Sequence, residues 1–187
     1  MGENTQAPLS TPRLTLTALC SPQSDRLAYL GNDPLVASHT ANIPSPYTEQ
    51  AALAFIQRSH VEAQHGDNFV FGIHLRSGEL IGVISLKPSH RHRSGHIGYW
   101  MGAAYRGHGY MTESVEAVLR LGFETLQLHR IHTACFAVNH ASARVLLKSG
   151  LALEGCSKGA FFKDGVFHDL LQFGAIAEQW LQGRQTT

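Results

Sequence analysis

A glycine-rich segment at residues 105–112, Tyr-Arg-Gly-His-Gly-Tyr-Met-Thr, carries the clearest chemical signal of this chain. It follows a strand-like run at residues 96–101 and precedes a stretch with apolar residues at helical spacing. The first N–H groups of a helix lack intrahelical partners, and the helix macrodipole adds partial positive charge there. Because glycines let an anion touch the backbone, this turn is a candidate phosphate cradle, with tight helix–strand packing as the alternative explanation.

The turn differs from two common nucleotide-binding motifs. No Gly-Lys-Ser/Thr ends it, as a Walker loop requires, and the third glycine of the dinucleotide fingerprint is absent. The turn therefore predicts a phosphorylated cofactor or substrate and does not specify which one.

The composition is that of one globular domain. The 187 residues are 43% hydrophobic and 16% charged, and the net charge of +1 does not favour nucleic-acid binding. No apolar run approaches the roughly 18 residues that a membrane span needs. The polar residues 1–10 lack the apolar core of a signal peptide, so we expect a cytoplasmic protein with a disordered lead.

The cysteines and histidines do not indicate a disulfide framework or a metal site. Cys20, Cys135 and Cys156 are odd in number and widely spaced, which fits a reducing compartment. Cys135 lies in an apolar run and is expected to be a buried small hydrophobe. His90 and His92 lie in a loop with neighbouring arginines that would repel a cation, so no metal is expected.

Periodicity, caps and turn residues predict the elements that position the turn. Strands are expected at residues 13–19, 69–75, 80–86, 96–101, 130–138, 151–156 and 166–173. Helices are expected at residues 21–31, 48–66 and 139–149, in the central stretch after the turn, and in a short tail at 175–181. The predicted buried face of the central helix is Met111, Val115, Val118, Leu119, Gly122 and Leu126. Leu53, Ile56 and Val61 partly mark the predicted buried side of the helix at residues 48–66. This order predicts a mixed α/β sheet with helices on both faces.

Several segments, in this order and spacing, resemble the GNAT superfamily of acyl-CoA-dependent N-acyltransferases, in particular its ribosomal-protein N-terminal alanine acetyltransferase branch. They are residues 98–102, the turn at 105–113, 128–131, 139–142, 147–151, 154–155 and 163–169. The resemblance implies one GNAT-like domain over residues 11–181, with a tail at 182–187. It also implies a mixed, mostly antiparallel, splayed sheet of about seven strands, and acetyl-CoA as cosubstrate without a metal.

The resemblance also implies a binding site for coenzyme A. The turn would hold the pyrophosphate by backbone amides, and the preceding strand would pair with the pantetheine arm and polarise the thioester carbonyl with one N–H. The family often has Gln or Arg where this chain has Ala104; Arg106 either compensates or is a solvated rim residue. The expected cofactor-binding residues are Tyr99, Trp100, Met101, Arg106, Gly107, His108, Gly109, Tyr110, Met111, Asn139 and Ser142.

By the same resemblance, Ser142 would hydrogen-bond the coenzyme A sulfur as acid or thiolate stabiliser. A first-turn serine without a ligand is the alternative, and Asn139 has a purely local alternative as a helix N-cap. His96 occupies a position where relatives often have Glu, so it is the candidate base; a histidine at a strand edge is the alternative.

Other polar residues near these motifs are given structural roles. Glu113 is expected to complement the helix dipole and turn away from phosphates. His168 and Asp169 either shape the acceptor pocket or form a structural pair. Where some relatives have a catalytic Glu, this chain has Phe161.

The sequence therefore predicts direct transfer of acetyl from acetyl-CoA to a primary amine. The acceptor is a protein N-terminus or a small molecule such as an antibiotic or polyamine, and a non-catalytic acyl-CoA sensor is the alternative from another class. The expected acceptor loops at residues 32–48 and 157–163 are not strongly acidic, which weakens a polycationic acceptor. A homodimer is compatible with the resemblance.

Overall fold

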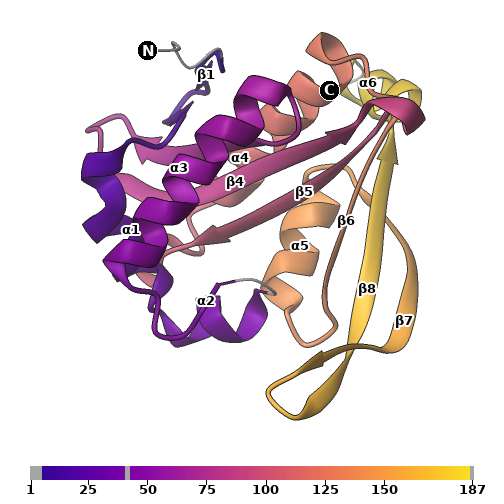
Figure 1. The fold of residues 1–187 in the computed structure, drawn as a ribbon. Coiled ribbons are helices and arrows are strands. Elements are labelled where there is room, and N and C mark those ends of the chain that lie inside the picture. The colour runs from indigo at the N-terminus through magenta and orange to yellow at the C-terminus, as the bar shows by residue number, and fades with distance from the viewer. Residues whose placement is uncertain (1–5, 41–42, 186–187) are drawn as a thin grey trace.

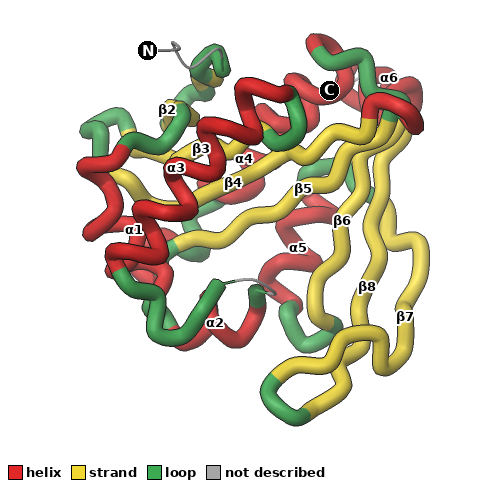
Figure 2. The backbone as a smooth tube through the Cα atoms, viewed as in Figure 1, coloured by secondary structure: helices red, strands yellow, loops and turns green. Residues whose placement is uncertain are grey.

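A twisted sheet with helices on both faces forms the centre of the computed structural model, which describes residues 6–40 and 43–185 (Figure 1, Figure 2). Its strand order is β1-β2-β3-β4-β5-β6-β8-β7. In this sheet β5 and β6 are parallel and the other neighbours are antiparallel. The strands are β1 (Leu9–Ser10), β2 (Leu14–Thr17), β3 (Phe69–Leu75), β4 (Leu80–Ser89), β5 (Ser94–Met101), β6 (Arg130–Phe136), β7 (Ala152–Lys163) and β8 (Val166–Ile176).

Helices cover the sheet in two groups, with α1 and α3 on one face and α4 behind the other (Figure 1). The α-helices are α1 (Ser24–Gly31), α2 (Pro34–His39), α3 (Glu49–His65), α4 (Tyr110–Arg120), α5 (His140–Lys148) and α6 (Ala177–Gln185). Short helical turns are η1 (Ser21–Gln23), η2 (His90–His92), η3 (Ala103–Tyr105) and η4 (Leu121–Thr125), the last of which is a π-helical turn that continues α4.

Two hydrophobic cores follow from the alternation of side chains along the strands. On β4, Val83 packs with α1 and α3, whereas the next residue, Ile84, packs with α4. The predicted buried face of the central helix is confirmed from Met111 to Gly122, and Leu126 is half-buried. Because both sheet faces are covered, the fold is the predicted mixed α/β layer arrangement.

Local capping and turn signals are confirmed. The Thr48 side chain accepts a hydrogen bond from the N–H of Ala51 at the start of α3, and Gly66 ends that helix in the left-handed region with φ of 72°. Gly150 does the same after α5, with φ of 89°. These elements form where the sequence predicts them because their signals are short-range.

Four expectations about elements are wrong. Leu9 and Ser10, expected in a disordered lead, pair with β2 as an eighth strand; residues 1–5, 41–42 and 186–187 lie outside the described residues. The expected loop after α1 contains α2, because the side chain of Asp33 accepts hydrogen bonds from two N–H groups of its first turn and Pro34 follows as N1. The expected loop at residues 157–163 belongs to β7, which pairs with β8 to its end. Val61, expected on the buried side of α3, is 52% exposed, since small residues at Ala52, Ser59 and Ala63 form that side with Ile56.

Candidate active site

The glycine-rich turn connects β5 to α4 and has the backbone of an anion cradle. Gly107 and Gly109 have φ of 80° and 79°, a conformation that other L-residues adopt with strain. A Cβ on Gly107 would have no atom within 4 Å, so the turn faces open space there. Gly109 is the N-cap of α4 and has no side-chain cap, which leaves first-turn N–H groups available to a ligand.

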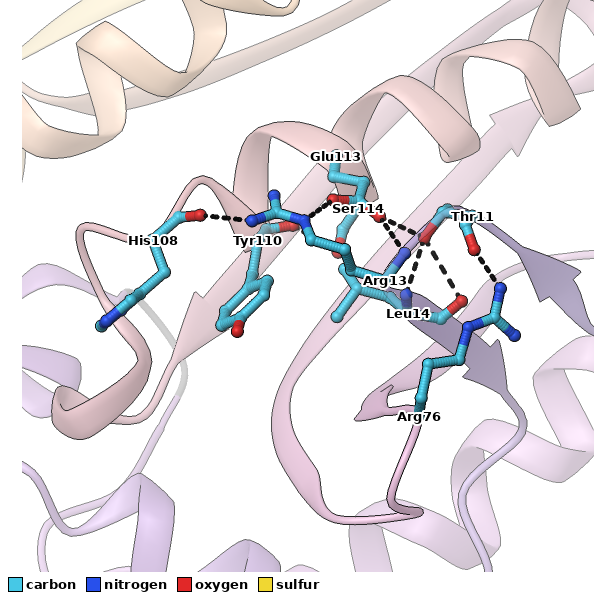
Figure 3. Close-up of polar contacts among 8 residues, drawn as sticks. All are labelled: Thr11, Arg13, Leu14, Arg76, His108, Tyr110, Glu113 and Ser114. Atoms are coloured by element: carbon cyan, nitrogen blue, oxygen red, sulfur yellow. Dashed lines mark hydrogen bonds and ion pairs between the residues drawn. The ribbon is translucent and has the colours of Figure 1, made fainter.

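An ion pair from Arg13, which directly precedes β2, supports this turn from outside (Figure 3). Arg13 Nε donates to Glu113 Oε2 at 2.7 Å, and Arg13 Nη1 donates to the carbonyl of His108 at 2.9 Å. The backbone N–H of Arg13 and the hydroxyl of Thr11 both donate to Glu113 Oε1. Burial alone would raise the pKa of Glu113, but these hydrogen bonds outweigh it and hold the pKa below its ordinary value. The structural role predicted for Glu113 is therefore confirmed.

Arg106 does not replace the missing side chain at position 104. Its Nε donates to the carbonyl of Met101 at 3.0 Å, and its Nη2 lies 3.2 Å from Asp33 Oδ1 at the start of α2. Its backbone N–H already donates to Ala103 O at 3.3 Å. Arg106 thus holds α2 beside the turn.

Strands β5 and β6 diverge next to the turn. Their parallel pairing covers Ser94 to His96 on β5 and Arg130 to His132 on β6, and it ends there. At the branch point the buried Thr133 hydroxyl donates to the carbonyl of Ile97 at 2.7 Å. Beyond it, β5 stays paired with β4 and β6 with β8, so the edges that face each other are unpaired. The predicted splay of the sheet is confirmed.

A cleft of about 1000 Å³ runs through this opening. The expected site residues that line it are His96, Tyr99, Trp100, Met101, Arg106, Met111, Asn139 and Ser142. Gly107, His108, Gly109 and Tyr110 are not among its lining residues; they follow Arg106 at the edge of the cleft. The structure therefore brings the predicted strand, the start of α4 and the start of α5 to one cavity.

Three polar side chains meet between the splayed strands. The Tyr99 hydroxyl lies 2.8 Å from Ser142 Oγ, and Asn139 Oδ1 accepts from the Ser142 N–H at 3.1 Å. Burial raises the pKa of Tyr99 well above its ordinary value, so its hydroxyl keeps its proton near neutral pH. Burial likewise raises the pKa of the Cys135 thiol, which is 8% exposed, as expected for a small buried hydrophobe.

The contact of the Tyr99 hydroxyl with Ser142 is not predicted from the sequence, which assigns only the backbone of Tyr99 to the site. A signal for it exists in the alternation of β5. Ile97, Tyr99 and Met101 all point to the face that α4 and α5 cover, while Trp100 packs with α1 and α3. The alternation therefore places the Tyr99 ring on the side of Ser142.

His96 lies on the opposite face of β5 from Tyr99, at the branch point of the splay. Part of its surface is exposed, and it lines the cleft. Partial burial, together with the nearby His132 and Lys87, lowers the pKa of His96 below its ordinary value. The imidazole is therefore neutral near pH 7 and can accept a proton.

His168 and Asp169 do not form a pair. The ring of His168 packs on Phe136 with centroids 5.0 Å apart, whereas Asp169 accepts hydrogen bonds from Lys158 Nζ and the Gly159 N–H. As neighbours on β8 they point to opposite faces, and neither is among the residues that line the cleft. Both are structural.

Two further findings hold for the described part of the chain. No group of three or more His, Cys, Asp or Glu side chains there is arranged to hold a metal ion. No helix within residues 6–40 and 43–185 is long and apolar enough to span a bilayer.

Known proteins are similar to this chain in sequence. The family model described as an acetyltransferase (GNAT) domain matches residues 13–152. The chain is 32% identical to the uncharacterized N-acetyltransferase YnaD of Bacillus subtilis (strain 168) over 136 residues, 72% of this chain and 77% of that protein. It is 29% identical to the ribosomal protein uS5-alanine N-acetyltransferase of Escherichia coli (strain K12) over 138 residues, 72% of this chain and 70% of that protein.

Solved structures agree in fold. The ribosomal-protein-S5-alanine acetyltransferase from Vibrio fischeri has a TM-score of 0.83 at 22% identity, over 94% of this chain and 99% of that one. The microcin C7 self-immunity acetyltransferase MccE, solved in complex with acetyl-CoA and AMP, has a TM-score of 0.81 at 22% identity, over 89% of this chain and 93% of that one.

Proposed function

Because this chain belongs to the GNAT family and is an acetyl-CoA-dependent N-acetyltransferase, we propose that its acceptor is the N-terminal amine of a protein. The observation that carries the proposal is the cleft between β5 and β6, which has unpaired backbone on both sides. An extended peptide can use such an edge by adding main-chain hydrogen bonds. The named activity of the uS5-alanine relative also supports this acceptor class.

The charges around the cleft favour an acceptor with a single ammonium group over a polycationic acceptor. Among the described residues that line it, Glu62 is the one carboxylate, and it already accepts a hydrogen bond from Asn68 Nδ2 at 2.9 Å. Arg58 and Arg106 line the same cleft. A polyamine needs several carboxylates, whereas a peptide N-terminus carries one charge followed by neutral backbone.

The residues of the turn and of β5 fit acetyl-CoA, which supplies the thioester whose acetyl group is transferred. Gly107 faces open space, and the N–H groups from Gly107 into the first turn of α4 would hold the pyrophosphate. The free edge of β5 from Tyr99 to Met101 would hold the pantetheine arm, and one of its N–H groups would polarise the carbonyl. Arg106 would contribute little to this binding, since its Nε and Nη2 are bonded to Met101 and Asp33.

Two side chains would move the protons. His96 would take the proton of the acceptor ammonium, directly or through water, which frees the nitrogen lone pair for attack. Ser142 would donate its hydroxyl hydrogen to the leaving sulfur, with the Tyr99 hydroxyl at 2.8 Å supporting it. These groups lie on opposite faces of β5, so the two transfers occur on opposite sides of the reacting centre.

An acceptor panel tests the proposal. Purified protein with acetyl-CoA is given a peptide with a free N-terminus, the same peptide with a blocked N-terminus, spermidine and an aminoglycoside, and free thiol is measured. We expect release with the free peptide and little with the others. Preferred turnover of a small molecule would overturn the protein acceptor, and CoA binding without thiol release from any amine would favour a sensor. A cytoplasmic location and a homodimer stay predictions.

A further inference from the structure

Two histidines stand side by side where the splay begins. His96 of β5 and His132 of β6 are Cα partners in the last pair of the parallel ladder. Partners in a parallel ladder point to the same face of a sheet, and here the two rings meet edge to face with centroids 5.4 Å apart. The pair therefore bridges the two strands at the inner end of the cleft.

His96 also separates two cavities. It lines the large cleft and also a smaller pocket of about 200 Å³. His132 lines the small pocket and is not among the residues that line the cleft. Lys87, Ser89 and Ser94 supply polar walls to the small pocket. A proton accepted by His96 in the cleft thus has a second basic ring beside it, which lines a separate small pocket.

The charged groups around the pair keep both rings neutral. Partial burial, His132 and Lys87 lower the pKa of His96; partial burial and Arg130 lower the pKa of His132, while Glu154 raises it. Arg130 holds Glu154 in a two-pronged ion pair, with distances of 2.6 and 2.5 Å. From α3, Arg58 and Glu62 line the same cleft as His96. Two neutral imidazoles can each accept and pass one proton.

Resting on the proposed role of His96, we propose that His132 is a positioning residue that receives the acceptor's proton from His96 and releases it to water in the small pocket. An N–H bond of the ammonium breaks and its electron pair stays on nitrogen, while an N–H bond forms on His96. The proton then moves to His132 and on to water, which returns both rings to the neutral state. No electron is transferred, and the neutral amine left by deprotonation of the acceptor ammonium is the nucleophile.

Substitution of His132 tests the relay. His132→Phe keeps an aromatic edge beside His96 and removes both ring nitrogens. We expect kcat to fall about tenfold, because a proton acceptor contributes on the order of 10²–10⁴ and His96 remains in place. The Kd for CoA should stay at the wild-type value, and added imidazole should restore much of kcat. His129→Phe, at an exposed histidine outside both cavities, is the matched control and should match wild type.

A His132→Phe enzyme with wild-type kcat and no response to imidazole would refute the relay. Lys87→Gln gives a second, independent measurement, since Lys87 is exposed and its removal leaves both rings in place. Loss of its positive charge raises the pKa of His96, so the acid limb of the kcat/KM profile should move to higher pH. An unmoved limb contradicts His96 as the proton acceptor from which the relay starts.

Failure of the proposed acceptor is distinguishable from failure of the relay. If wild-type protein transfers acetyl to a lysine or a small amine and not to a peptide N-terminus, the protein N-terminal acceptor is wrong. The His132 and Lys87 variants are then measured with the amine that does release thiol. A wild-type rate of the His132→Phe enzyme with that amine counts against the relay alone, whereas an unmoved acid limb of the Lys87→Gln enzyme counts against His96 as the base.

Discussion

At the residue scale, the Ser142 and Tyr99 hydroxyls are the groups that we propose for protonation of the leaving sulfur. Ser142 is fixed from two sides, because its N–H donates to Asn139 Oδ1 and its Oγ lies 2.8 Å from the Tyr99 hydroxyl. Asn139 is thus the N-cap that its sequence position suggests, and the same cap orients the residue three positions later. In this motif a local helix cap also orients the proposed catalytic serine.

Ser142→Ala should lower kcat about 10²-fold, since a positioned acid is lost, while the Kd for CoA stays near wild type. Tyr99→Phe should cost about fivefold, because one hydrogen bond of about 1 kcal/mol to Ser142 disappears while Ser142 remains. Single-turnover thiol release and CoA titration measure the two effects. A Ser142→Ala enzyme with wild-type kcat would show that the sulfur is protonated elsewhere.

The acid side of the pH profile is also a residue-scale property. His96 must be neutral to accept a proton, and its pKa lies below the ordinary 6.5. Activity should therefore fall as pH drops through that lowered pKa, so kcat/KM stays at its plateau near pH 7. A profile measured with a peptide acceptor that is half-maximal above pH 6.5 on its acid side contradicts His96 as the base in this environment.

At the element scale, the proposed CoA binding by the turn between β5 and α4 depends on the positive φ of its glycines. Gly107→Ala should weaken CoA binding about tenfold, because an L-residue at φ of 80° costs about 1–2 kcal/mol and the turn can relax only by losing its shape. Gly155→Ala is the matched control, since Gly155 also has open space around it and has no positive φ. Calorimetric titration of CoA compares the two, and equal affinities would show that the turn does not bind the cofactor.

A second element-scale feature is the support that the turn receives from the segment just before β2, through Thr11 and Arg13. Glu113→Gln removes the carboxylate that holds Arg13 and Thr11, so we expect the turn to loosen and CoA affinity to fall about fivefold, with a loss of about 1 kcal/mol in the free energy of unfolding. Glu116 lies on the same helix as Glu113 and forms an ion pair with Arg184 of α6. Glu116→Gln breaks this ion pair and should leave CoA affinity unchanged. If both variants bind CoA alike, the ion pair does not support the cradle.

Elements with short-range signals were predictable from the sequence. The side chains of Thr48 and Asn139 cap the starts of α3 and α5, and Gly150 ends α5 with a positive φ. The two-residue strand β1 has no such signal, because it exists through pairing with β2. The bonds of Arg106 to Asp33 and Met101 likewise join segments whose proximity arises from the fold, so the sequence left the role of Arg106 open.

At the scale of the whole molecule, the splay divides the sheet and other elements join its two parts. The buried Thr133–Ile97 hydrogen bond closes the inner end of the opening. At the other end, Lys163 of β7 donates to the carbonyls of Ala37 and Thr40, which ties the β7–β8 hairpin to α2. Leu35 and Val36 of α2 line the cleft, so this tie fixes one of its walls. Both ends of the cleft are therefore held by hydrogen bonds, and its fixed shape fits the proposed flexible N-terminus of an acceptor protein.

The position of the acetyl group on a bifunctional acceptor tests the central claim most directly. A peptide with one free N-terminal amine and one internal lysine is incubated with the protein and acetyl-CoA, and the product is sequenced by tandem mass spectrometry. We predict acetyl on the N-terminal nitrogen, with one free CoA thiol released per acetyl group. Acetyl on the lysine side chain, or no acetylated peptide while a small amine is turned over, would contradict the proposed function.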